Sequence, residues 1–200
     1  MAVPFIYNPV YFIHDTIIMI NTDTFFAKIK ANGLFKSLTQ KQVDSIEAIL
    51  HECEAQRVTD LRQIAYIFAT AYHECYNPKT PETRLTPIVE FGGEKYLKSK
   101  KYYPFYGRGF SQLTWDYNYL KEKKRLGIDV FAKPDLMLNI PAAANSHVYC
   151  MMNGTYTGRK LSDYINIEKC DFINARRVVN GTDKAELIMS YAAKFLEALK

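Results

Sequence analysis

Acid–base chemistry by carboxylates is the first possibility that the sequence raises, through Glu74. This residue ends a stretch, residues 60–74, in which apolar side chains recur at helical spacing. In the last turn of such a helix its carboxylate emerges at the rim of an apolar surface, where loss of water favours the neutral form that a general acid needs. A surface glutamate at a fraying helix end is an equally good interpretation of this stretch taken alone.

The segment after Glu74 supplies three candidates for a second carboxylate: Glu82, Glu90 and Glu94. A pair of carboxyl groups suits hydrolysis of a glycosidic bond, in which an acid protonates the leaving oxygen and a base activates water on the opposite face of the sugar. Glu90 lies in Pro-Ile-Val-Glu-Phe-Gly-Gly, where apolar neighbours anchor the segment and glycines let the backbone approach a ligand. Glu94 lies among lysines and is expected to be solvated, as is Glu82. We therefore predict Glu90 as the base, with Glu94 and Glu82 as alternatives.

Other catalytic chemistries fit the sequence poorly. His73-Glu74 suggests a zinc peptidase, but that motif needs a second histidine one helical turn on, and position 77 is Asn. The remaining histidines are His14, His51 and His147. The chain has no Gly-x-Ser-x-Gly elbow and no P-loop, and the Gly-Arg-Gly at 107–109 is too short for a dinucleotide fingerprint. We expect neither a metal nor a cofactor.

The composition is that of an ordinary globular protein, and 200 residues suit a single domain with a substantial core. A net charge of +5 would draw the protein modestly toward anionic polymers. The 15 tyrosines suit a groove for a hydroxylated ligand, although tyrosines are also common half-buried fillers. The four cysteines, at positions 53, 75, 150 and 170, form no Cys-x-x-Cys pair, and we expect them to be reduced core residues.

Helical patterns must position these residues. Helices are expected over about 21–34, 40–50, 60–74, 115–126, 141–152, 171–179 and from 182 or 183 onward. Reciprocal capping pairs are expected at three helix starts: Thr39 with Gln42, Asp60 with Gln63, and Asp183 with Glu186. Between 77 and 106 the periodicity disappears into a long loop of a kind that is usually functional. Residues 1–21 form an N-terminal arm whose structure the pattern leaves open. The sequence predicts a mainly α protein with one domain over 1–200.

Three motifs in order resemble one known family. The segment Tyr-Gly-Arg-Gly-Phe-Ser-Gln-Leu-Thr-Trp-Asp-Tyr-Asn-Tyr at 106–119 resembles the most characteristic segment of family 19 glycoside hydrolases. This family comprises plant-type chitinases and the related lysozyme-like endolysins of bacteriophages. His73-Glu74 at a helix end matches the family upstream, and Asn180-Gly181, after Arg-Arg-Val-Val and before the last helix, matches it downstream. The resemblance covers roughly residues 60–199.

The resemblance implies a lysozyme-like, two-lobed α-helical domain with a long irregular loop over the active-site cleft. It also implies an inverting hydrolase of β-1,4-linked N-acetylglucosamine polymers. By position, Glu74 is similar to the general acid, and Thr114 stands where the family has a Ser or Thr that holds the attacking water. The loop resembles the endolysin branch, in which Glu90 followed by Tyr96 fits the second carboxylate best.

The resemblance further implies a set of substrate-binding side chains. Gln112 and Asn118 match polar residues that bind sugar, and Asn180 matches one that orients the water or the base. The predicted substrate-binding residues are Gln112, Asn118, Asn180, Tyr106, Arg108 and His73. Arg108 is expected to pair with a catalytic carboxylate, whereas Trp115 and Tyr117 are expected to pack rather than to stack on sugar rings.

The sequence favours bacterial peptidoglycan over chitin as the substrate, because we find no secretion signal and no appended chitin-binding module beside a basic charge balance. We expect synthesis in the cytoplasm and action at the cell wall after holin-type release or lysis. A chitinase is the alternative enzyme, and a non-catalytic binder of chitin or peptidoglycan is the alternative of another class. The basic residues at 95–101 and 121–125 fit solvated faces better than nucleic-acid binding. We expect a monomer whose partner is a polysaccharide, without nucleic acid or membrane insertion.

Overall fold

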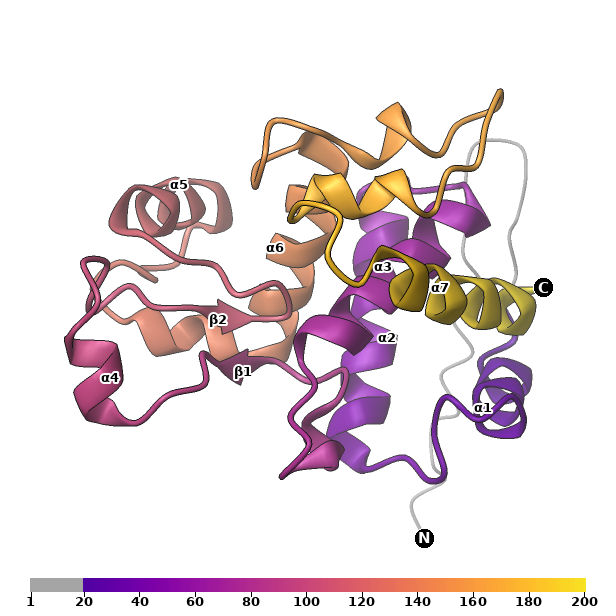
Figure 1. The fold of residues 1–200 in the computed structure, drawn as a ribbon, viewed down its shortest axis with the longest axis horizontal. Helices are drawn as coiled ribbons and strands as arrows, with labels where there is room; N and C mark the ends of the chain where they lie inside the picture. The colour runs from indigo at the N-terminus through magenta and orange to yellow at the C-terminus, as the bar shows by residue number, and fades with distance from the viewer. Residues whose placement is uncertain (1–19) are drawn as a thin grey trace, which may run out of the picture.

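The computed structural model describes residues 20–200, so the predicted arm over 1–21 lies almost entirely outside the described residues. Helices dominate the described chain, in two lobes (Figure 1). The larger lobe holds α1 (Thr22–Ala31), α2 (Gln40–Ala55), α3 (Leu61–Glu74), α6 (Ile140–Asn153) and α7 (Ala185–Leu199). The smaller lobe holds β1 (Ile88–Val89), α4 (Glu94–Lys98), β2 (Arg108–Gly109) and α5 (Asp116–Leu126). Short 3-10 turns complete the described part: η1 (Pro81–Thr83), η2 (Pro134–Leu138), η3 (Leu161–Asp163) and η4 (Asn174–Val178).

The central element is α3, which runs through the middle of the larger lobe (Figure 1). The sequence predicts one apolar stripe along it, but every residue from Gln63 to Tyr72 is buried, which requires packing on all sides. The polar side chains inside are satisfied: Gln63 donates to the carbonyl of Ile165 at 2.7 Å and Thr70 to that of Tyr66 at 2.9 Å. The helix that ends at Glu74 is therefore held rigidly along its length.

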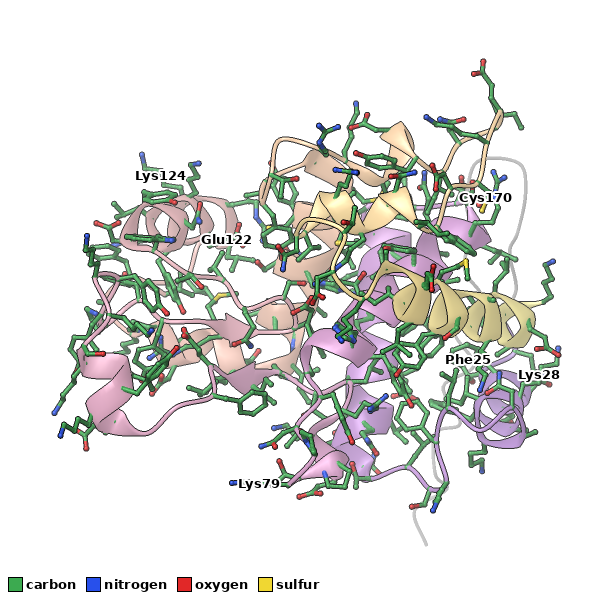
Figure 2. All side chains as sticks on the ribbon, viewed as in Figure 1. Phe25, Lys28, Lys79, Glu122, Lys124 and Cys170 are labelled. Carbon is green, nitrogen blue, oxygen red and sulfur yellow. The ribbon has the colours of Figure 1, made fainter. Side chains whose placement is uncertain are left out.

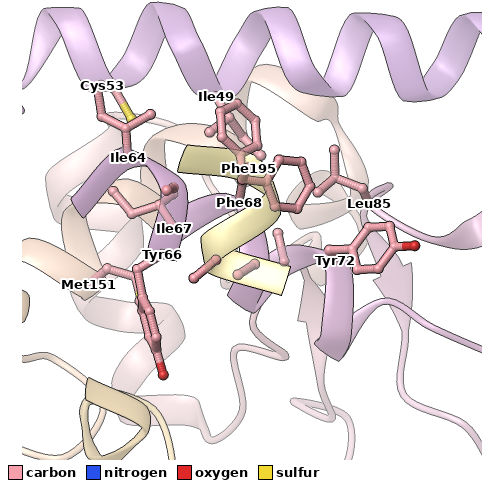
Figure 3. Packing of buried hydrophobic residues seen from close by; sticks show 14 of the residues in the cluster. Ile49, Cys53, Ile64, Tyr66, Ile67, Phe68, Tyr72, Leu85, Met151 and Phe195 are labelled. Atoms are coloured by element: carbon pink, nitrogen blue, oxygen red, sulfur yellow. The ribbon is translucent and has the colours of Figure 1, made fainter. Parts of the chain in front are cut away.

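An aromatic cluster fixes the C-terminal half of α3 against α7. Phe68 stacks on Phe195 with ring centroids 5.3 Å apart, and Tyr72 meets the same Phe195 edge-on at 5.7 Å (Figure 3). Phe25 of α1 joins the cluster 5.6 Å from Phe68. Each such pair adds about 0.5–1.5 kcal/mol beyond its buried area. The cluster lies directly behind the helix turn that carries Glu74.

The predicted helix caps fare differently from one another. Thr39 and Gln42 form the reciprocal capping box of α2, as predicted. Asp60 caps α3 by accepting from the backbone N–H of Arg62, but Gln63 does not return the bond because the core contact with Ile165 takes its amide. The pair Asp183 and Glu186 is wrong as a capping pair: α7 begins after Lys184, with no side-chain cap.

The segment 77–106 is less irregular than predicted. Its strand β1 pairs antiparallel with β2, with Ile88 opposite Gly109 and Val89 opposite Arg108. A second, small apolar core of Leu113, Tyr119, Val130 and Met137 supports this lobe. The pairing fixes the backbone just before position 90, and the N–H of Glu90 itself donates to the carbonyl of Gly107 at 2.7 Å. The sequence places this residue on an open loop.

Three of the four cysteines meet the prediction. Cys53, Cys75 and Cys150 are free and buried, whereas Cys170 is free but exposed, so its expected core position is wrong. Among residues 20–200, no helix has both the length and the apolar character to cross a bilayer. Within the same range, no cluster of His, Cys, Asp and Glu side chains has the geometry to hold a metal ion.

Candidate active site

Glu74 is the last residue of α3, and its carboxylate contacts a buried cation. The Nη1 group of Arg176 donates to Glu74 Oε1 at 2.5 Å. The Glu74 side chain is 21% exposed to solvent, whereas the Arg176 side chain is 4% exposed. Arg176 also donates through Nε to the carbonyl of Asp183 at 3.1 Å, which fixes the direction of the guanidinium. The carboxylate is therefore accessible to a ligand, and Arg176 fixes its orientation. The sequence predicts a purely apolar rim here, which is wrong because a buried guanidinium contacts the carboxylate.

His73 lies next to this ion pair. Burial lowers the pKa of the His73 imidazole, and the nearby charge of Glu74 partly opposes that shift. An imidazole with a lowered pKa is neutral at pH 7, so His73 can offer a ligand one donor and one acceptor nitrogen. Its role as a substrate contact stays a prediction.

The end of α3 lies against the small lobe. Cys75, the residue after Glu74, donates its thiol to the carbonyl of Phe110 at 3.4 Å, just beyond β2. Since β2 pairs with β1, and Glu90 directly follows β1, this contact connects the two predicted catalytic elements. Residues from widely separated parts of the sequence are thereby brought to one junction between the lobes.

Glu90 is held through both carboxylate oxygens. Tyr102 donates its hydroxyl to Oε1 at 2.6 Å, and the backbone N–H of Gly107 donates to Oε2 at 2.9 Å. The hydrogen bond to Glu90 raises the pKa of Tyr102 to about 12, so this hydroxyl remains a donor at neutral pH. Tyr96, the tyrosine that follows Glu90 in the pattern of the family resemblance, is 46% exposed, and its ring lies against Lys100. The contact belongs to Tyr102.

The alternative carboxylates lie in different surroundings. Glu94 is exposed and pairs with Lys98 along α4, with 2.6 Å between the charged atoms. Glu82 is exposed in η1. Neither has the enclosing contacts that Glu90 has, which favours Glu90 as the second carboxylate.

Gln112, Thr114 and Asn118 form one connected group after β2. The Thr114 hydroxyl donates to the carbonyl of Gln112 at 2.8 Å, and the Asn118 amide donates to the carbonyl of Thr114 at 2.9 Å. Gln112 adopts a positive φ of 56°, a strained conformation of a kind found at functional sites. Because the Thr114 hydroxyl donates its hydrogen to the Gln112 carbonyl, its oxygen can accept a hydrogen bond from a water or a sugar.

Asn180 lies on the Glu74 side of the junction. Its backbone N–H donates to the carbonyl of Arg176 at 3.0 Å, and its side chain is exposed beyond η4. The Asn180 Oδ1 atom accepts from the N–H of Gly181 at 2.8 Å, which leaves its amide NH₂ group for a ligand.

Comparison with known proteins places this geometry in a known fold. No family model matches the chain. An endochitinase of Arabidopsis thaliana is 32% identical over 93 residues, which are 42% of this chain and 29% of that protein. The chain thus spans less than a third of that relative. Chitinase C from Streptomyces griseus superposes with a TM-score of 0.63 at 20% identity, over 90% of this chain and 76% of that one. A bacterial family 19 chitinase superposes with a TM-score of 0.55 at 20% identity, over 86% and 93% of the two chains.

The chain has the fold of the family 19 chitinases. The likeness confirms the resemblance and the helical, lysozyme-like fold class that the sequence predicts.

In this family 19 fold, Arg108 does not pair with either Glu74 or Glu90, so that prediction is wrong. Its side chain is 4% exposed, and its Nε donates to Asp135 Oδ1 at 2.7 Å. Its Nη1 donates to the carbonyls of Pro104 and Tyr106, and the Tyr106 ring lies 3.8 Å from the guanidinium. The buried Arg108 therefore connects segments of the small lobe through these hydrogen bonds, and the Tyr106 ring packs on it.

Two expectations about aromatic residues are also wrong. Trp115 and Tyr117 do not pack into the core: they are 39% and 51% exposed. Trp115 has a positive φ of 76° at the start of α5, and its ring is not part of the small apolar core.

The sequence analysis missed Arg176 and Tyr102 as partners of the two carboxylates. Arg176 stands in the Arg-Arg-Val-Val segment that precedes Asn180, so the family motif marks its neighbourhood without giving it a role. Tyr102 is one of 15 tyrosines, and no spacing singles it out.

Proposed function

We propose that this chain is an inverting glycoside hydrolase that cleaves β-1,4 linkages in N-acetylglucosamine-containing polysaccharide. The observation that carries the proposal is the pair of carboxylates at the lobe junction, each with dedicated partners. Glu74 is oriented by Arg176, and Glu90 by Tyr102 and Gly107. Two oriented carboxyl groups are what glycoside hydrolysis requires.

Glu74 acts as the general acid in this proposal. It must take up a proton before the reaction, and it gives that proton to the glycosidic oxygen as the bond to the anomeric carbon breaks. It thereby returns to the carboxylate that pairs with Arg176. The Arg176 guanidinium, already 2.5 Å from Oε1, then stabilises the negative charge that develops. Because Arg176 is buried and fixed on Asp183, little reorganisation is needed at the moment of transfer.

Glu90 acts as the general base. It removes a proton from a water that attacks the opposite face of the sugar, and the Thr114 oxygen accepts the second hydrogen of that water. The hydroxyl of Tyr102 and the N–H of Gly107 keep the Glu90 carboxylate in place before the water arrives. Gln112, Asn118 and Asn180 supply amide groups for the hydroxyl and acetamido groups of the substrate.

Chitin is the first candidate polymer, because the similar proteins are named chitinases. Peptidoglycan is the second candidate polymer, and the excess of basic residues near the site favours it over chitin. The segment 77–138 carries 12 basic and 7 acidic side chains, so it holds the net charge of +5 of the whole chain. Peptidoglycan carries carboxylates, whereas chitin is neutral.

The proposed activity is tested by product analysis. Wild-type protein and Glu74→Gln would be incubated with chitin hexasaccharide and with purified peptidoglycan, and new reducing ends identified by mass spectrometry. New N-acetylglucosamine or N-acetylmuramic acid ends with the wild type alone support the proposal. Tight binding of both polymers without any new ends would favour a non-catalytic binder.

We further propose that the protein acts at the cell wall after release from the cytoplasm. A wall hydrolase made inside the cell meets its substrate only after it crosses the membrane or after the membrane is disrupted. Cells expressing the protein would lyse soon after co-expression of a holin and not before. Lysis at the same rate without a holin would contradict this route.

A further inference from the structure

The small lobe presents a row of aromatic rings that begins at the proposed base, with a half-buried Tyr102 followed by exposed rings. Tyr102, whose hydroxyl binds Glu90, meets Trp115 edge-on with ring centroids 5.4 Å apart. Trp115 in turn stacks on Tyr117 at 6.1 Å, with an angle of 19° between the ring planes. Tyr96, which is 46% exposed, lies on α4 of the same lobe. The row therefore runs outward from the site along one surface.

Lysines accompany these rings. Lys121 Nζ lies 5.7 Å from the centre of the Tyr117 ring, and Lys100 Nζ lies 3.9 Å from that of Tyr96. Lys124, one turn from Lys121, points outward from α5 at the edge of the molecule (Figure 2). We call the four aromatic residues and these three lysines the aromatic–lysine surface: Tyr96, Tyr102, Trp115, Tyr117, Lys100, Lys121 and Lys124.

The three lysines are not neutralised by the protein. Within residues 20–200, no carboxylate lies in ion-pair distance of Lys100, Lys121 or Lys124. Two neighbouring acidic groups are engaged elsewhere, since Glu94 pairs with Lys98 and Asp129 with Lys123. Asp116, between Trp115 and Tyr117, accepts from the N–H of Tyr117 and leaves the three lysines in excess. Glu122 pairs with Arg125 and points inward from α5 (Figure 2). The positive charge is therefore available to an external anion.

We propose that the aromatic–lysine surface binds an anionic glycan strand and positions it so that the strand extends into the site beside Glu90. The C–H faces of sugar rings pack on aromatic rings, while lysines attract carboxylates on the same strand. The direct contact between Tyr102 and Glu90 makes this surface an extension of the site. The inference rests on the proposed function and narrows its substrate to a glycan with carboxylate substituents, of which peptidoglycan is the wall polymer.

Single-stranded nucleic acid is the competing ligand, since it also uses aromatic stacking and positive charge. The contact with Glu90 favours the glycan, because it can place an uncharged N-acetylglucosamine unit beside this carboxylate, whereas a nucleic acid carries a phosphate at every unit. A single-stranded DNA of about 20 nucleotides therefore serves as a competitor in the test.

Binding is measured with Glu74→Gln protein, which leaves the polymer uncut, by co-sedimentation with purified sacculi or chitin beads over a range of NaCl concentrations. We expect sacculus binding to weaken as salt rises and chitin binding to change little. Lys121→Glu with Lys124→Glu should lower sacculus affinity at least tenfold, and Tyr117→Ala should lower affinity for both polymers. The matched control is Lys30→Glu with Lys194→Glu, which makes the same charge change at exposed sites of the larger lobe and should cost less than twofold.

The outcomes separate this inference from the proposed function. Equal losses from the two lysine pairs, no loss from either, or displacement of sacculi by the DNA would overturn the aromatic–lysine surface as an anionic glycan site. Cleavage of chitin hexasaccharide by otherwise wild-type protein is measured separately. If that cleavage is absent while the small-lobe lysines alone govern sacculus binding, the hydrolase proposal fails and the surface stands.

Discussion

Glu74 and Arg176 are 102 positions apart in the sequence, and their charged atoms lie 2.5 Å apart in the fold. One residue ends α3, and the other lies in the turn η4 that precedes α7. Because α3 and α7 pack along their lengths through Phe68, Tyr72 and Phe195, the core itself sets this distance. The candidate acid is thus positioned by the packed core of the larger lobe.

Replacing Glu74 by Gln should remove nearly all hydrolysis and leave the fold intact, because the amide cannot donate a proton to the glycosidic oxygen. General acid catalysis contributes about 10²–10⁴-fold, so the loss should be at least of that order. Initial rates on chitin hexasaccharide, with circular dichroism as the folding control, give the comparison. A folded variant with more than a tenth of the wild-type rate would show that Glu74 is not the acid.

Replacing Arg176 by Lys should lower kcat about tenfold with little change in KM, since an ammonium keeps the charge but cannot contact both Glu74 and Asp183 in the planar geometry of a guanidinium. Arg177→Lys is the matched control, because Arg177 is exposed and bonds only to Asn174. Equal kcat values for the two variants would remove Arg176 from the mechanism.

Replacing Glu90 by Gln should leave the enzyme nearly inactive, whereas Glu82→Gln and Glu94→Gln should stay active. The reason is that only Glu90 is oriented by Tyr102 and Gly107 at the lobe junction. The three variants are compared at saturating substrate. If Glu94→Gln proves inactive and Glu90→Gln active, the base has been assigned to the wrong residue of the loop.

Replacing Thr114 by Val should reduce turnover more than binding, because the change keeps the volume and deletes the oxygen that accepts from the attacking water. Thr114→Ser retains the hydroxyl and should recover most of the rate. Kinetics give turnover, and calorimetry with the Glu74→Gln background gives binding. A loss of binding with unchanged turnover would make Thr114 a substrate contact instead.

Acid should destabilise the fold through His147. Its Nε2 faces the carbonyl of Ile67 at 3.0 Å and must carry the proton, so its Nδ1 accepts from the Ser111 hydroxyl. Burial lowers the pKa of His147 to about 4 from 6.5. Between these values the unfolded chain binds a proton that the folded chain does not, so stability falls as the pH is lowered through this window.

The full effect of His147 should be about 3 kcal/mol, since one pKa unit corresponds to about 1.4 kcal/mol. Urea unfolding at pH 7 and pH 4.5 measures it. His147→Gln should show a clearly smaller drop in unfolding free energy between the two pH values, and His51→Gln, at an exposed site, should not. The same drop in all three proteins would show that other groups control acid stability.

Much of the fold follows from local rules. Helix periodicity predicts α6 closely, and its ends follow local rules: Pro141 lies in its first turn, and Gly154 ends it in a left-handed conformation. The capping box of Thr39 and Gln42 likewise depends only on neighbours in sequence. Caps fail where tertiary contacts compete, as when the core contact with Ile165 takes the Gln63 side chain.

The candidate site divides in the same way. The family motif predicts that Gln112, Thr114 and Asn118 lie together, because they belong to one turn and the helix that follows it. The partner of an arginine is not local: Arg108 pairs with Asp135 and Arg176 with Glu74, and no periodicity in the sequence distinguishes the two cases. Trp115 is exposed and has a positive φ, a conformation that a tryptophan seldom adopts and that sequence patterns therefore do not predict.

The most direct test of the central claim is the anomeric form of the first product. Two carboxylates that act as acid and base through a water invert the anomeric carbon, whereas a nucleophilic carboxylate retains it. Proton NMR of chitin hexasaccharide in the first minutes of reaction, before mutarotation, distinguishes the two. The account predicts that the α-anomer appears first from the β-linked substrate. A β-anomer appearing first would contradict the roles given to Glu74, Glu90 and Thr114.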